Sequence, residues 1–149
     1  MEFNRHICRR LHEEHDATLA LWGKVEQSFA SGAGDAALMK KAAGALEHEI
    51  AEHFDFEENQ LFPRLAASGE GDIGELLLEE HVVIRAASRR FVELVRADPA
   101  HAELRRLAME LAERLFAHVQ KEEMSLLPAL DDLIDEIADQ ELTEAYLAP

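Results

Sequence analysis

A segment of eleven residues occurs twice in this chain with the same spacing of histidine, glutamate and proline. The copies span residues 53–63 and 118–128, and both follow the pattern H-x-x-x-E-E-x-x-L-[FL]-P. On a helix of about 3.6 residues per turn, residues four apart lie on the same face. Each copy therefore directs its histidine and its first glutamate to one side of a helix. Two such pairs on separate helices indicate two halves of one metal site.

Apolar residues recur at helical spacing along the rest of the chain, and no alternating pattern typical of strands appears. Asp35, Asp72 and the pair Asp98–Pro99 are candidate starts of helices because each can cap a first turn. A loop of serine and glycine at residues 31–34 should end the first helix. The pattern predicts four long helices, at about residues 4–30, 36–67, 73–97 and 99–127.

Pro63 should kink or tighten the last turns of the second helix. After Pro128 we expect a short acidic amphipathic tail helix that packs across one end with Leu130, Leu133, Ile134 and Ile137. Long helices joined by loops of about five residues or fewer favour an all-α, up-down-up-down antiparallel four-helix bundle with a short C-terminal helix. We expect residues 1–149 to form a single domain.

The charge of the chain excludes some functions. Asp and Glu outnumber Lys and Arg by 31 to 15, which gives a formal net charge of −16. Such a chain repels phosphate backbones and anionic membranes, so we expect no nucleic-acid and no membrane partner. No apolar run approaches the roughly 20 residues of a membrane span, and the N-terminal residues lack the apolar core of a secretory signal. We therefore expect a soluble cytoplasmic protein. The single cysteine, Cys8, excludes an internal disulfide and a cysteine-based zinc cluster.

The chain has eight histidines, and their helical-wheel positions divide them. Four lie within about 60° of the centre of the apolar stripe of their helix. These four are His15, His53, His81 and His118, and both Glu57 and Glu122 also face inward. In an up-down-up-down bundle the four inward histidines fall at levels that agree within roughly 9 Å, about the size of a site for two metal ions.

Other histidines show that a carboxylate four residues away is not enough to identify a metal ligand. His48 and Glu52 are also four apart, but they point away from the apolar stripe and should face solvent. His12 and Asp16 form a similar pair. His101 falls in the expected first turn of the fourth helix, far from the level of the candidate site.

Six buried polar groups among aliphatic side chains would be costly without a partner, and a bound cation removes that cost. Imidazole and carboxylate ligands without thiolate suit iron or manganese, and zinc is an alternative. Six ligands exceed what one zinc ion accepts. If Glu57 and Glu122 each bridge two metals and the histidines divide evenly, each metal receives four protein donors. An oxo or hydroxo bridge would then leave one position open for a small ligand.

The chain resembles the hemerythrin-like, HHE cation-binding family over essentially its whole length. The family pattern H…HxxxE…H…HxxxE corresponds to six residues of this sequence: His15, His53, Glu57, His81, His118 and Glu122. The resemblance implies a four-helix bundle that encloses a non-haem di-iron centre bridged by carboxylates.

The sequence also departs from the oxygen-carrying members of that family. They have HxxxH on the third helix, where this chain has Arg85, and their carboxylate on the fourth helix lies five residues after its histidine. Glu123 has that spacing and Glu122 does not. The set of four histidines and two glutamates instead resembles iron-centre repair proteins and bacterial relatives linked to nitric oxide and peroxide stress. The repair proteins usually carry an additional cysteine-bearing domain that this sequence lacks, which weighs against a repair role.

These observations favour a di-iron protein that reacts with peroxide, nitric oxide or O2, in stress defence or iron handling. A non-catalytic protein that binds, senses or stores O2 or iron is the alternative, and a metal-free structural bundle is a third. The expected partner is a small diatomic molecule or peroxide, and a redox partner protein is a further option. The sequence leaves open whether Arg85, Glu58 or Glu123 enters the site.

Overall fold

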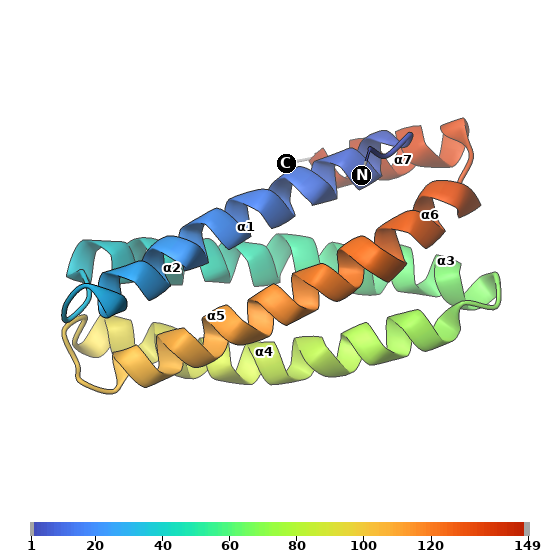
Figure 1. The fold of residues 1–149 in the computed structure, drawn as a ribbon. Coiled ribbons are helices and arrows are strands. Elements are labelled where there is room, and N and C mark those ends of the chain that lie inside the picture. Colours follow the sequence, from blue (N-terminus) through green and yellow to red (C-terminus); the bar gives the residue numbers. More distant parts are fainter. Residues whose placement is uncertain (1, 148–149) are drawn as a thin grey trace.

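The computed structural model describes residues 2–147, and every regular element among them is a helix. Figure 1 shows the helices packed lengthwise as a bundle, with connecting loops at its two ends. Helix α1 packs against α5 and α2, and α4 packs against α2, α3 and α5. The elements in chain order are α1 (His6–Ala30), α2 (Ala36–His48), η1 (Glu49–Phe54), η2 (Glu57–Leu61), α3 (Phe62–Ala67), α4 (Gly71–Ala97), α5 (Leu104–Lys121), η3 (Glu122–Leu126), α6 (Leu127–Leu133) and α7 (Glu136–Leu147).

The segments η1, η2 and η3 are π-helical stretches inside longer helices, and two of them precede a proline. Inside a regular α-helix, the ring of a proline would collide with the carbonyl group four residues earlier. In both copies of the repeated segment the residue before the proline instead bonds five residues back. Phe62 N–H donates to the Glu57 carbonyl, and Leu127 N–H donates to that of Glu122. The turns before Pro63 are thus widened, where we expected a kink or a tightening.

The start of the second long helix agrees with expectation. The Asp35 side chain accepts hydrogen bonds from the backbone N–H groups of Ala37 and Leu38, at 2.9 and 3.2 Å. Gly34 precedes it with a φ of +91°, a conformation that disfavours a side chain. The helix then continues without interruption through α2, η1, η2 and α3.

The expected starts of the next two helices were wrong. Helix α4 begins at Gly71, so Asp72 lies in its first turn and does not cap it. Helix α5 begins at Leu104, several residues after Asp98–Pro99. The Asp98 side chain instead accepts from Ala100 N–H at 3.0 Å, and its carbonyl accepts from His101 N–H at 3.0 Å. These bonds close a local turn, which competes with helix initiation.

The C-terminal region also differs from expectation. The helix does not stop at Pro128 but continues through α6 to Leu133, and the separate tail helix is α7. Of the four apolar residues assigned to the tail, Leu130 and Ile134 are buried, whereas Leu133 and Ile137 are 41% and 70% exposed. Helix α7 packs beside α1, as Figure 1 shows. Buried Asp139 of α7 accepts hydrogen bonds from His6 N–H and Ile7 N–H, both at 2.9 Å, and so caps α1.

The apolar core consists of two clusters separated along the bundle. One contains Trp22, Phe91 and Leu111, and the other contains Ile7, Leu65 and Leu130. In α1, for example, the first cluster takes residues 22–29 and the second takes residues 7–11. The stretch between them contains His15. A buried polar layer therefore lies between two apolar regions that keep water away from it.

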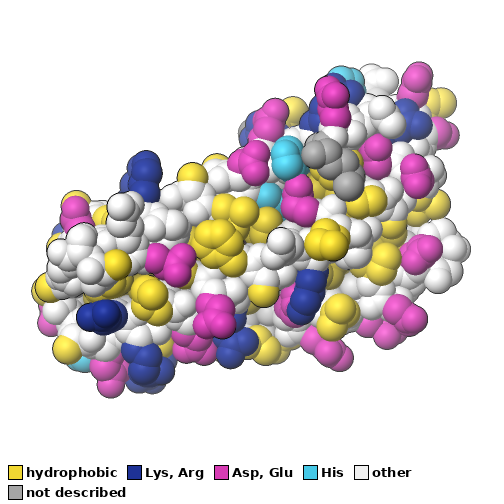
Figure 2. Space-filling view, in the orientation of Figure 1, with side chains coloured by type: hydrophobic (Ala, Val, Ile, Leu, Met, Phe, Trp, Pro, Cys, Tyr) yellow, Lys and Arg dark blue, Asp and Glu magenta, His cyan; other side chains and the backbone are white. Residues whose placement is uncertain are grey.

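The surface carries the acidic excess of the sequence. Figure 2 shows acidic side chains spread over the visible face, with Lys and Arg side chains and small apolar areas among them. None of the helices in residues 2–147 has a stretch long and apolar enough to cross a bilayer.

Candidate metal centre

The polar layer contains the six residues singled out in the sequence. Each comes from a different element: His15 from α1, His53 from η1, Glu57 from η2, His81 from α4, His118 from α5 and Glu122 from η3. All six are buried, with exposed fractions between 0% and 2%. The π-helical turns contain three of these six, in agreement with the frequent occurrence of such turns at functional sites.

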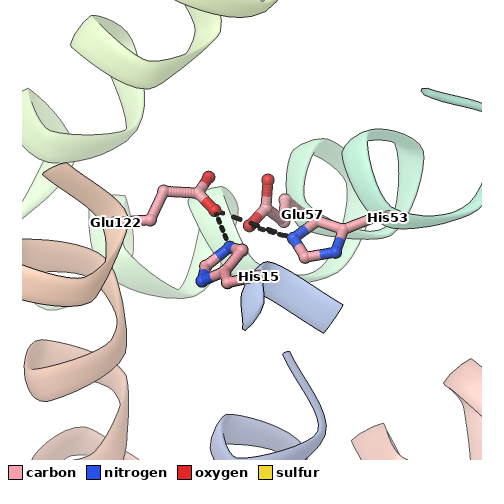
Figure 3. A group of neighbouring side chains, drawn as sticks. All are labelled: His15, His53, Glu57 and Glu122. Atoms are coloured by element: carbon pink, nitrogen blue, oxygen red, sulfur yellow. Dashed lines mark hydrogen bonds and ion pairs between the residues drawn. The ribbon is translucent and has the colours of Figure 1, made fainter. Parts of the chain in front are cut away.

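The six side chains form two groups that share their carboxylates. His15 and His53 form one group with Glu57 and Glu122, while His81 and His118 form the other with the same two glutamates. Within each group the potential ligand atoms lie within 4.8 Å of one another. Figure 3 shows the first group, in which the four side chains point toward a common centre.

The contacts inside the centre all involve the Nε2 atoms of the histidines. In the first group, His15 Nε2 lies 2.7 Å from Glu122 Oε1, and His53 Nε2 lies 3.0 Å from Glu57 Oε2. In the second group, the Nε2 atoms of His81 and His118 lie 3.1 Å apart. Imidazole nitrogens and carboxylate oxygens therefore converge in both groups.

The Nδ1 atoms point outward, and each one donates a hydrogen bond to a further glutamate. The four bonds are His15 to Glu123 (2.6 Å), His53 to Glu14 (2.9 Å), His81 to Glu58 (2.6 Å) and His118 to Glu80 (2.8 Å). A carboxylate on Nδ1–H fixes the orientation of the ring and leaves Nε2 directed inward. This is the usual surrounding of a histidine that binds a metal.

The four outer bonds form a closed ring around the bundle. Glu14 of α1 holds the histidine of η1, and Glu58 of η2 holds that of α4. Glu80 of α4 then accepts from the histidine of α5, and Glu123 of η3 accepts from His15 of α1, which closes the ring. Each outer glutamate is a sequence neighbour of an inner residue on its own helix but supports a histidine on the next helix. The ring thus couples the packing of the helices to the orientation of the histidines.

Sequence reasoning missed Glu14 and Glu80 entirely. Glu58 and Glu123 were considered, and the structure places both among the outer carboxylates and outside the two inner groups. The sequence did contain one indication of these glutamates: each outer glutamate is the immediate neighbour of an inner residue. Wheel positions could not select them, since a half-buried glutamate at the edge of the apolar stripe has the same pattern as a surface residue.

The carboxylates have a strong effect on the histidines. Burial by itself lowers the pKa of His15, but hydrogen bonds to Glu122 and Glu123 outweigh it and raise the pKa to about 9. His81 behaves in the same way, with a pKa raised to about 9 by Glu122 and Glu57. Burial opposes ionisation of Glu122, yet the surrounding histidines hold the pKa of this carboxyl well below its ordinary value. The centre therefore favours positive charge, and a bound metal ion can supply that charge in place of protons.

The remaining histidines lie outside the two groups. His48 and Glu52 are exposed, as the helical wheel predicted. His12 is half-buried, and its Nδ1 contacts Glu123, so it supports the outer layer and is not simply a solvent-facing residue. His101 lies in the connection before α5 and not in a helical turn. Its Nδ1 accepts a hydrogen bond from Glu103 N–H at 3.0 Å.

Arg85 occupies the position that carries a second histidine in oxygen carriers, as the resemblance indicates. Its Nη1 donates to Glu58 Oε2 at 2.5 Å, the same oxygen that accepts from His81. Its guanidinium lies 5.7 Å from the centre of the Phe54 ring, and that ring stacks on His81 at 3.8 Å. Arg85 thus reinforces the outer layer and contributes no atom to the inner groups.

Two carboxylate oxygens show that the inner residues suit a cation. Glu57 Oε1 and Glu122 Oε2 are buried and have no hydrogen-bond donor. They lie 3.2 Å from His81 Nε2 and 3.1 Å from His118 Nε2, without the geometry of a hydrogen bond. Buried oxygens without a donor are costly in a metal-free protein, and coordination of a metal ion would satisfy them. The nitrogen and oxygen donors fit iron, manganese or zinc.

Comparison with protein families matches residues 6–130 to the hemerythrin HHE cation-binding domain. Comparison with curated proteins gives no significant match, and comparison with solved structures gives none either. The match covers most of the chain and includes all six residues of the two inner groups. The resemblance suggested by the sequence is therefore confirmed, and the chain belongs to the hemerythrin HHE cation-binding family.

Proposed function

We propose that the protein binds two iron ions, one in each inner group, with Glu57 and Glu122 as shared ligands. The observation that carries this proposal is the common orientation of the four histidines, each with Nδ1–H on an outer carboxylate and Nε2 directed inward. The equal division of the histidines between two groups that share both glutamates supports two ions in preference to one. Manganese or zinc could occupy the same ligands.

The arrangement of helices is part of the same proposal. An up-down-up-down four-helix bundle with a C-terminal helix would bring one histidine from each long helical segment to the same level. The short connections at residues 31–35, 68–70 and 98–103 support this arrangement, because short loops join antiparallel neighbours.

We further propose that the centre reacts with a small oxidant, either peroxide, nitric oxide or O2, in stress defence or iron handling. Bound iron would supply the redox chemistry. The chain itself contributes two apolar clusters that keep bulk water from the centre, and a ring of hydrogen bonds that holds the histidines in place. Imidazole and carboxylate donors without thiolate are typical of non-haem iron sites that react with O2.

Metal analysis with rapid-mixing spectroscopy tests this function. Protein purified under iron supply should contain about two iron ions per chain, as two groups of four ligands require. The reduced protein should then be oxidised rapidly by O2 or peroxide, with catalytic consumption of the oxidant over many turnovers. Optical changes that reverse when O2 is removed, with no net consumption, would instead support the non-catalytic binding protein. Absence of bound iron would contradict both.

A further inference from the structure

The outer side of α4 exposes a group of large apolar side chains. Of the ten large apolar residues that the described part of the chain exposes, four lie within residues 76–83: Leu76, Leu78, Val82 and Val83. Val82, in the middle of the helix, is 62% exposed. Beside it a groove of about 430 Å³ runs between α4 and α5, with Val82 and Val83 in one wall and Leu107 in the other. Single exposed apolar residues are ordinary, but a group of them beside a groove indicates an interaction surface.

The charges of α4 are of opposite sign on the two sides of this apolar stretch. Residues 71–80 contain four acidic residues and no Lys or Arg, whereas residues 85–97 contain four arginines and one glutamate. The helix dipole favours acidic residues in a first turn and basic residues in a last turn, but it acts only within those turns. Glu79 and Arg89 each lie eight residues inside the helix, so the dipole does not account for them.

Two of these charges share the face of Val82 and have no partner within the chain. Glu75 and Arg89 lie seven residues before and seven residues after Val82, a spacing that keeps side chains on one face of a helix. Both are exposed, and neither forms an ion pair with any residue between 2 and 147. The face therefore carries an acidic group, an apolar centre and a basic group in that order, at equal distances along the helix.

We propose that this face of α4 is the contact between two copies of the chain, with the two α4 helices antiparallel about a twofold axis at Val82. A contact of this symmetry needs a face that is complementary to itself. The equal spacing of Glu75 and Arg89 from Val82 meets that condition, because the axis brings Glu75 of each copy opposite Arg89 of the other. Burial of the apolar centre stabilises the dimer, and the two ion pairs set its orientation.

The negative charge of the chain does not oppose this contact. Residues 85–114, which contain the second half of α4 and the start of α5, have seven arginines and five acidic residues, so the charge of −16 is carried by other segments. Exposed charges more than about 8 Å apart are largely screened at physiological ionic strength. An acidic partner protein would pair with Arg89 alone and a basic one with Glu75 alone, whereas a second copy of the chain pairs with both.

Sedimentation velocity of the full-length protein, with its metal bound, tests this proposal. The 16.8 kDa chain should sediment as a dimer at micromolar concentration. Val82→Glu should raise the dissociation constant roughly a hundredfold or more, because the axis brings two carboxylates together and like charges across an interface are strongly unfavourable. Ile137→Glu is the matched control, since Ile137 of α7 is 70% exposed, and this variant should remain a dimer. A native chain that stays monomeric, or a dimer that Val82→Glu leaves intact, would overturn the proposal.

Exchange of the two charges tests the antiparallel arrangement. Glu75→Arg brings arginine opposite Arg89, and Arg89→Glu brings glutamate opposite Glu75. Each variant alone should therefore dimerise roughly tenfold more weakly, because two attractive surface pairs become two repulsive ones. An equal mixture of the two variants restores opposite charges and should form mixed dimers with an affinity close to that of the native chain.

A charge reversal elsewhere is the control for this exchange. Glu141 is an exposed glutamate of α7, so Glu141→Arg changes the net charge as Glu75→Arg does and should leave the dissociation constant unchanged. Equal weakening by Glu141→Arg and Glu75→Arg would mean that net charge alone acts and would refute the contact. A mixture of the Glu75 and Arg89 variants that dimerises no better than either variant alone would refute the antiparallel pairing.

Discussion

The outer ring of carboxylates makes a specific prediction for Glu80→Gln. Glu80 Oε1 accepts the His118 Nδ1–H at 2.8 Å, and its other oxygen is paired with Lys121. Burial opposes ionisation of Glu80, but Lys121 and His118 outweigh it and lower the pKa of this carboxyl. It is therefore ionised at neutral pH. Glutamine has the same shape and can still accept from Nδ1–H, so the substitution removes the charge and the bond from Lys121, and it keeps the bond from His118.

The expected size of the effect follows from that change. A hydrogen bond to a charged group contributes about 1.5–3 kcal/mol, whereas a neutral one contributes about 0.5–1.5 kcal/mol. The difference of roughly 1–1.5 kcal/mol corresponds to about a tenfold loss of metal affinity. This value lies at the lower end of the roughly 10- to 100-fold losses found when groups that support metal ligands are removed.

Competition between the protein and a chelator for Fe(II) under anaerobic conditions measures this affinity. Glu79→Gln is the matched control, because Glu79 is the exposed neighbour of Glu80 in α4 and removes the same charge. Lys121→Met removes the other partner of Glu80 and should have a smaller effect than Glu80→Gln. Equal affinities for the Glu79 and Glu80 variants would mean that net charge alone acts, and the proposed role of the ring would be wrong.

Four further predictions concern the centre and the start of α1. His118→Ala should lose most of the bound metal, as measured by metal analysis after gel filtration, whereas exposed His48→Ala should retain it. Metal affinity should rise as pH increases from about 6.5 to 9, because His15 and His81 have pKa values of about 9 and must lose protons to bind. Over the same pH interval the metal-free protein should become less stable in urea. Protonated His15 and His81 stabilise the folded state fully below pH 6.5, the ordinary pKa of histidine, and this stabilisation is lost as the pH rises through about 9. Asp139→Ala should lower the free energy of unfolding by about 1–2 kcal/mol, since it removes the cap of α1, and an unchanged urea midpoint would exclude that role.

The sequence carried enough information to find the inner residues. His53 and His118 each have a glutamate four residues later, and this spacing puts both side chains on one face of a helix. Helical-wheel positions separated inward-facing His15 and His81 from exposed His48. The structure brings these histidines together in the two buried groups. All-helical structure was likewise predictable, because apolar periodicity was strong along the whole chain.

Other features depended on contacts that the sequence does not encode locally. Glu14 and Glu80 support histidines on different helices, so their role appears only once the helices are packed. The sequence Asp98–Pro99 is compatible with the start of a helix and also with a turn. In the structure it forms a turn, because Asp98 accepts hydrogen bonds from Ala100 N–H and His101 N–H. The π-helical turns η2 and η3 directly precede the prolines of the repeated segment, but proline alone does not specify whether a helix tightens or widens.

Anaerobic reconstitution with Fe(II), followed by iron and protein determination on the same sample, tests the central claim most directly. Two groups that share Glu57 and Glu122 predict about two iron ions per chain in the native protein. They also predict that His118→Ala, which removes a ligand from one group only, loses iron while His48→Ala does not. A native protein that binds no more than one iron ion per chain, or a His48 variant that loses as much iron as the His118 variant, would contradict the account.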